Sequence, residues 1–109
     1  MTVQELAKKA NLDAALLPAP DIEITGVYVG DLLSWVMGKA DRGNVWITIM
    51  SNVNVTAVAT VADLSCILLA EGVTLDSDAE EAARTRCINV LKTDASAYEI
   101  AVKIGAILK

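Results

Sequence analysis

The stretch Val45–Gly72 constrains the fold of this chain most strongly. It contains two apolar runs, separated by a turn and an alanine-bearing segment. The first run, Val45–Met50, is almost continuously apolar and rich in β-branched residues, which is typical of a strand covered on both faces. The second run, Cys66–Ala70, has the same character. Between them, the Val and Thr content of Asn54–Leu64 would also allow a strand. We predict a helix there, because two parallel strands need a crossover of about this length.

The remaining segments add further strands and helices around this βαβ unit. Capping boxes at Thr2–Glu5 and Ser77–Glu80 predict two helix starts, and Asp31 and Thr93-Asp94 are predicted to open two more helices. The predicted helices cover residues 3–10, 32–37, 54–64, 78–86 and 95–108, and the predicted strands cover residues 22–29, 45–50, 66–70 and 88–91. This alternation predicts an α/β fold: a mostly parallel sheet of about four strands with helices on both faces.

The length and composition of the chain limit its class. With 109 residues it is predicted to form an N-terminal helix and connector over residues 1–20, stiffened by Pro18 and Pro20, and a single α/β domain over residues 21–109. It is 54% hydrophobic, yet no uninterrupted apolar run approaches the roughly 18 residues of a membrane span. The net charge of −5 argues against nonspecific nucleic-acid binding, which depends on neutralising phosphates. We therefore expect neither a nucleic-acid nor a membrane partner.

Cysteine and histidine usage bears on chemistry and location. Cys66 and Cys87 lie in or beside predicted core elements without metal-ligand spacing, and no targeting segment is visible, so we expect free thiols in a reducing cytoplasm. Cys87 is predicted on the buried face of the helix that begins near Asp78. Histidine, the commonest general base and metal ligand, is absent. No nucleophile–base pair is evident either, and we predict that the chain is not an enzyme.

The predicted ends of the parallel strands gather the polar residues. In a parallel sheet, the C-terminal strand ends open on one edge, and ligands bind there. The candidate ligand-binding residues at this edge are Ser51, Asn52, Asn54, Glu71, Gly72 and Asp94. We expect Ser51, Asn52, Glu71 and Asp94 to share one pocket there. The alternative is that Asp31, Asn54, Asp94 and Ser96 only cap helices, and that Glu71 is solvated rather than bound to a ribose hydroxyl. The sequence identifies no cofactor and no specific metal site.

Surplus apolar surface predicts a homodimer. The last predicted helix has one narrow polar stripe, formed by the i,i+4 pair Glu99 and Lys103, and residues 32–37 are similarly apolar. One small sheet offers each helix a single face to bury against. We expect a two-fold interface to cover the remainder, with its anchors drawn from Trp35, Met37, Tyr98, Val102 and Leu108.

Over Ile22–Leu108 the chain resembles the DRTGG domain family. The landmarks are the stretches ITGVYVGDLLSWV, VWITI, CILLAEG and INVLKTDASAYEIA. The family's Asp-Arg and Thr-Gly-Gly motifs are replaced here by Ser51-Asn52 and Ala70-Glu71-Gly72, so that only Gly72 is kept. The family is similar to the N-terminal domain of HPr kinase/phosphorylase, and occurs between paired CBS domains, before phosphotransacetylase catalytic domains, and alone near iron-hydrogenase genes.

The resemblance implies a regulatory or ligand-sensing module without a reaction of its own. By resemblance, its partner would be an enzyme in a hydrogenase-associated or phosphotransacetylase-like context. Our interpretation is a homodimeric regulatory module that binds a small, nucleotide-like ligand at the C-terminal edge of its sheet and modulates a partner protein. Two alternatives stay open: a structural or assembly protein without a small-molecule ligand, and a small enzyme.

Overall fold

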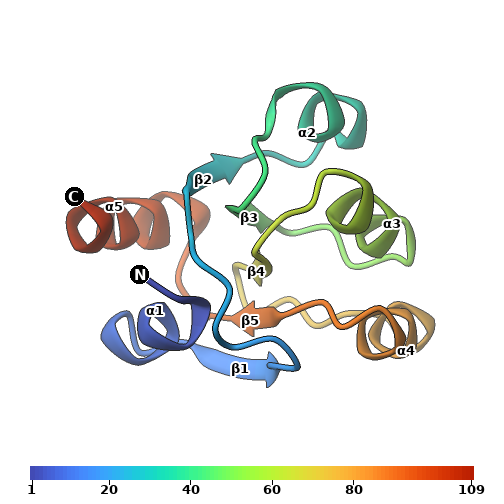
Figure 1. The fold of residues 1–109 in the computed structure, drawn as a ribbon, viewed down its shortest axis with the longest axis horizontal. Helices are drawn as coiled ribbons and strands as arrows, with labels where there is room; N and C mark the ends of the chain where they lie inside the picture. Colours follow the sequence, from blue (N-terminus) through green and yellow to red (C-terminus); the bar gives the residue numbers. More distant parts are fainter.

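The computed structural model describes residues 1–109, and its centre is one five-stranded sheet with helices on both faces (Figure 1). The spatial strand order is β1-β5-β4-β3-β2, with β2 to β5 parallel and β1 antiparallel to β5. In chain order the elements are α1 (Val3–Lys9), β1 (Asp13–Leu16), β2 (Gly26–Val29), α2 (Leu33–Lys39), β3 (Asn44–Thr48), α3 (Asn54–Val61), β4 (Cys66–Leu69), α4 (Ser77–Thr85), β5 (Val90–Lys92) and α5 (Ala97–Leu108). This confirms the predicted α/β fold, with one strand more than the expected four.

The two central strands, β3 and β4, are buried along their whole length. Successive side chains of a strand point to opposite faces, so each strand serves both layers. Trp46, Ile67 and Leu69 pack under α2, α3 and α4, whereas Ile47 and Leu68 pack under α1 and α5. Figure 1 shows these two helical layers on opposite sides of the sheet. Double coverage explains why β3 and β4 have no polar alternation.

The segment between β3 and β4 is helical, as predicted. Within α3, Val55, Val58 and Ala59 are buried in the layer shared with α2 and α4. On the neighbouring α4, the buried side chains are the small Ala79 and Ala83. Small side chains on adjoining helices let them lie close over a narrow sheet.

The N-terminal segment differs from prediction. Residues 13–16, expected within the connector, form β1 and pair with β5. The sequence DAAL has low β propensity, so only the pairing with β5 makes it a strand. The strand expected from Ile22 begins instead at Gly26. Residues 22–24 contact the N-terminus: the Val3 N–H donates to Ile22 O at 3.0 Å, and the Ile24 N–H donates to Met1 O at 2.9 Å.

Helix starts were predicted with mixed success. The capping box of Thr2 and Glu5 is confirmed. The other three are corrected: the N-cap residues are Leu32 rather than Asp31, Asp76 rather than Ser77, and Ser96 rather than Asp94. In each case the polar residue that the pattern favoured lies one or two positions from the actual cap. Of these three residues, Asp31 uses its carboxylate for other hydrogen bonds, to Thr48 and Ile49.

The end of α4 also differs from prediction. Cys87, expected on its buried face, is exposed beyond the helix end with φ +57°, whereas Ala79 and Ala83 are buried as expected. A residue with positive φ ends the helical run, so the 3–4 spacing no longer holds at Cys87. No helix of the structure is long and apolar enough to cross a membrane.

Candidate ligand-binding edge

All four predicted strand exits lie along one edge of the sheet. Strands β2, β3, β4 and β5 run parallel, so their C-terminal ends face the same way. The candidate residues Ser51, Asn52 and Asn54 follow β3, Glu71 and Gly72 follow β4, and Asp94 follows β5. We call this the C-terminal edge.

The loop after β3 is fixed by side-chain hydrogen bonds to its neighbours. The Thr48 hydroxyl and the Ile49 N–H both donate to Asp31 Oδ1, at 2.7 and 3.0 Å. The Ser51 hydroxyl donates to Asp76 Oδ1 at 3.1 Å, and the Asp76 N–H donates back to Ser51 O at 2.9 Å. Asp31 thus ties the ends of β2 and β3 together, and Ser51 ties the β3 loop to the start of α4.

Asn52 and Asn54 have local positions at the start of α3. Asn52 Oδ1 accepts from the Asn54 N–H at 2.9 Å, a turn that shapes the entry to the helix. Asn54 is the first residue of α3, its side chain is exposed, and its side-chain amide makes no hydrogen bond within the chain. Of these two side chains, that of Asn54 is the one open to a ligand.

The loops after β4 and β5 are joined through their backbones. The Glu71 N–H donates to Ala95 O and the Gly72 N–H to Thr93 O, each at 2.9 Å. Glu71 and Gly72 both have left-handed backbone conformations, with φ of +60° and +72°. A Cβ on Gly72 would lie 3.1 Å from Asp94 Oδ1. The structure therefore brings Glu71, Gly72 and Asp94 together, with both carboxylates exposed.

The edge is rich in carboxylates and forms an open surface. Asp31, Glu71, Asp76 and Asp94 lie along it, and the one nearby cation, Lys92, donates from Nζ to the Thr74 hydroxyl at 2.8 Å. None of the cavities is lined by the candidate residues: one of about 70 Å³ beside the edge is lined in part by Leu69, Thr74 and Lys92, and one of about 360 Å³ is lined by Met1, Ile24, Thr25, Gly26, Ile107, Leu108 and Lys109. No group of three His, Cys, Asp or Glu side chains is placed to hold a metal ion.

Sequence reasoning missed Asp76 and Thr74. Asp76 precedes Ser77, and either residue type is a common N-cap, so the pattern alone did not separate them. Asp76 occupies the cap position yet makes no side-chain cap bond, because its carboxylate is engaged by Ser51. The signal that could have found this pair is the redundancy of two capping residues in succession.

The cysteines have different environments. Cys66 is buried on β4, and burial raises the pKa of its thiol to about 12. A thiol that stays protonated at neutral pH is a poor nucleophile. Cys87 is exposed at the opposite end of the sheet from the C-terminal edge. Neither cysteine therefore contributes to the candidate site.

No family model and no curated protein matches the chain by sequence. Among solved structures, the chain is similar to the CBS and DRTGG domains of the regulatory region of Clostridium perfringens pyrophosphatase, complexed with its activator diadenosine tetraphosphate. The TM-score is 0.71 at 14% identity, and the alignment covers 94% of this chain and 45% of that chain. The chain thus spans less than half of its structural neighbour. This likeness confirms a DRTGG-like fold, and the neighbour is a regulatory region rather than a catalytic domain.

Proposed function

We propose that this protein is a non-catalytic regulatory module. In this proposal it binds a small, nucleotide-like ligand at the C-terminal edge, forms a homodimer and modulates a partner enzyme. The observation that carries the proposal is the convergence of four parallel strand ends on one edge, in a fold shared with the regulatory region of a pyrophosphatase. Ligands of parallel α/β sheets bind in this place.

The charges of the C-terminal edge define the part of a nucleotide that fits. Carboxylates predominate, and no arginine lies among the residues of the strand exits. Carboxylate oxygens accept hydrogen bonds from ribose hydroxyls or base amines, whereas they repel phosphates. We therefore assign the nucleoside part of the ligand to this edge, with Glu71 as acceptor and the Asn54 amide as a second polar contact.

Thermal unfolding with adenosine, AMP and ATP tests this assignment. A ligand that binds only the folded state raises Tm. We expect adenosine to raise Tm most and each added phosphate to reduce the shift. Glu71→Gln and Asn54→Ala should weaken the shift. The matched control is Glu81→Gln, which removes an exposed carboxylate from α4 away from the strand exits. If none of the three compounds changes Tm, the ligand-binding proposal is wrong.

One observation favours a second function, that of a structural or assembly protein. Asp31, Ser51 and Asn52 are already engaged in hydrogen bonds within the chain, and no cavity is lined by the candidate residues. Under this alternative, the polar residues of the C-terminal edge only fix the conformations of the loops through hydrogen bonds within the chain. The same experiment decides, since a structural protein would show no ligand-dependent Tm in the wild type or in any variant.

A further inference from the structure

The two edges of the sheet are built differently. At one edge, β1 carries the charged Asp13, its register with β5 shifts between Ala14 and Leu16, and Pro18 follows shortly after the strand. Charges, irregular register and prolines are the means by which proteins prevent an edge strand from pairing with another chain. The β1 edge is therefore blocked.

The opposite edge, β2, has none of these features. Its sequence, GVYV, contains no charge and no proline, and its register with β3 is regular from Gly26 to Val29. Both edge strands are four residues long, so length does not distinguish them. Strand β2 pairs on one side only, which leaves backbone N–H and C=O groups on its other side without a strand partner.

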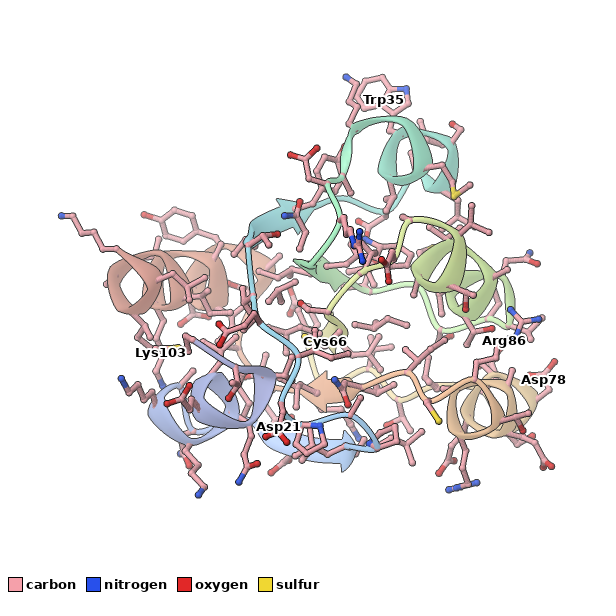
Figure 2. The ribbon with its side chains drawn as sticks, viewed as in Figure 1. Asp21, Trp35, Cys66, Asp78, Arg86 and Lys103 are labelled. Carbon is pink, nitrogen blue, oxygen red and sulfur yellow. The ribbon has the colours of Figure 1, made fainter.

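Exposed apolar side chains are concentrated around the β2 edge. Of the ten large hydrophobic residues that are exposed, six lie on β2, α2, α5 or the turn between β2 and α2: Val29, Leu32, Trp35, Met37, Tyr98 and Val102. Helices α2 and α5 flank β2 on opposite faces of the sheet (Figure 1). Figure 2 places Trp35 on the outer side of α2, at the β2 end of the molecule.

The orientation of α5 places its exposed apolar side toward the same edge. Lys103 lies on the side of α5 that faces α1 (Figure 2). Tyr98 is five residues earlier, which corresponds to about 140° of rotation around the helix. Tyr98 is 78% exposed, and this rotation places it on a different side of α5 from the one that faces α1. Gly105 is two turns further along the same side, where a Cβ would meet no atom within 4 Å.

We propose that two copies of this chain pair through their β2 edges, antiparallel across a two-fold axis, so that two five-stranded sheets become one continuous sheet. This inference rests on the homodimer of the proposed function and specifies its interface. The axis would place α2 beside the partner's α2 on one face, and α5 beside the partner's α5 on the other. An edge strand that meets itself across a two-fold axis is self-complementary by construction.

The charge distribution favours a second copy as the occupant. The chain carries a net charge of −5, so a self-association surface is favoured where like charges are few. Strand β2 has no charged residue, and the one charged residue of α2, Lys39, has its Nζ 4.1 Å from the centre of the Trp35 ring. The charged residues of α5, Glu99 and Lys103, are on the stripe away from Tyr98. The surface is therefore mostly apolar, and its one carboxylate beside β2, that of Asp31, already accepts hydrogen bonds from Thr48 and Ile49.

Light scattering of wild type and two lysine variants at micromolar concentration tests the proposal. We expect the wild type to have twice the 11.5 kDa mass of one chain. Val29→Lys should halve that mass, because it places a charge on the proposed interface. The matched control is Ala15→Lys, which adds the same charge to the exposed β1 edge and should leave the dimer intact. Circular dichroism verifies that each variant is folded.

A second measurement applies if Val29→Lys does not fold. Amide hydrogen exchange of the wild type should slow in β2 as protein concentration rises, while exchange in β1 stays constant. A monomeric wild type, a dimeric Val29→Lys protein, or protection of β1 instead of β2 would each overturn the inference. The ligand assay is independent: a monomer that adenosine still stabilises refutes only this interface, whereas a dimer without any Tm shift refutes only the ligand.

Discussion

Asn89 shows how a single buried amide connects distant segments. It is 1% exposed, its Nδ2 donates to Ala19 O at 2.7 Å and to Ser65 O at 3.0 Å, and its Oδ1 accepts from the Ala19 N–H at 2.9 Å. Asn89→Ala would leave these groups without partners. We expect a loss of about 2–3 kcal/mol in the free energy of unfolding, measured in urea. Asn89→Asp would bury a carboxylate against the carbonyl oxygens of Ala19 and Ser65, so it should lose at least as much, and a smaller loss than that of Asn89→Ala would contradict this account.

Gly72, at the C-terminal edge, has a backbone conformation that favours glycine over any other residue. Its φ of +72° and the 3.1 Å that would separate an added Cβ from Asp94 Oδ1 both oppose a side chain. We expect Gly72→Ala to lower the free energy of unfolding by about 1 kcal/mol or more. The contrasting variant is Gly38→Ala in α2, where space is open and a gain of about 0.5–1 kcal/mol is expected. Thermal denaturation of the two variants should therefore shift in opposite directions.

At the scale of elements, the first and last helices, α1 and α5, begin with the same capping motif. Thr2 with Glu5, and Ser96 with Glu99, form complete capping boxes. Hydrogen bonds from the backbone and side chain of the cap residue hold the pKa of Glu5 and of Glu99 below the ordinary value of 4.5. Each lowered pKa contributes stability above pH 4.5, which is lost as the pH falls through the folded-state value.

The double variant Glu5→Gln, Glu99→Gln should therefore show a weaker fall of stability with acid than the wild type. Glutamine keeps the oxygen that accepts from the cap N–H but does not titrate, which separates geometry from charge. The measurement is urea unfolding at neutral pH and at several values below pH 4.5. Glu81→Gln, outside any capping box, is the control. Parallel pH profiles for the double variant and wild type would count against this prediction.

The elements that the sequence predicted well are those whose pattern is local. Central strands β3 and β4 are continuous apolar runs because both of their faces are covered, and α3 follows from the crossover that parallel strands require. Strand β1 was missed because nothing local favours it: DAAL becomes a strand by pairing with β5, more than 70 positions further along the chain. The cap of α2 was missed because Asp31 accepts tertiary hydrogen bonds instead of capping, and that of α4 because Asp76 and Ser77 are both common cap residues.

At the scale of the whole molecule, the position of the candidate site was more predictable than its contacts. Parallel topology alone places Ser51, Glu71 and Asp94 on one edge. The hydrogen bond between Ser51 and Asp76 depends on where α4 begins. The sequence pattern is compatible with a start at Asp76 or at Ser77, so it did not predict this contact. The solved structure that this chain is similar to has the same fold at 14% identity, so the architecture does not depend on most of the particular residues.

The antiparallel strand β1 has a consequence for how far assembly can proceed. A sheet with two receptive edges would add copies without end and grow into fibres. Here the shifted register and Asp13 close one side, so a chain joined through β2 has no receptive edge left. In the proposed dimer, the four residues of β1 would prevent further copies from adding to the sheet, so that assembly would stop at two chains.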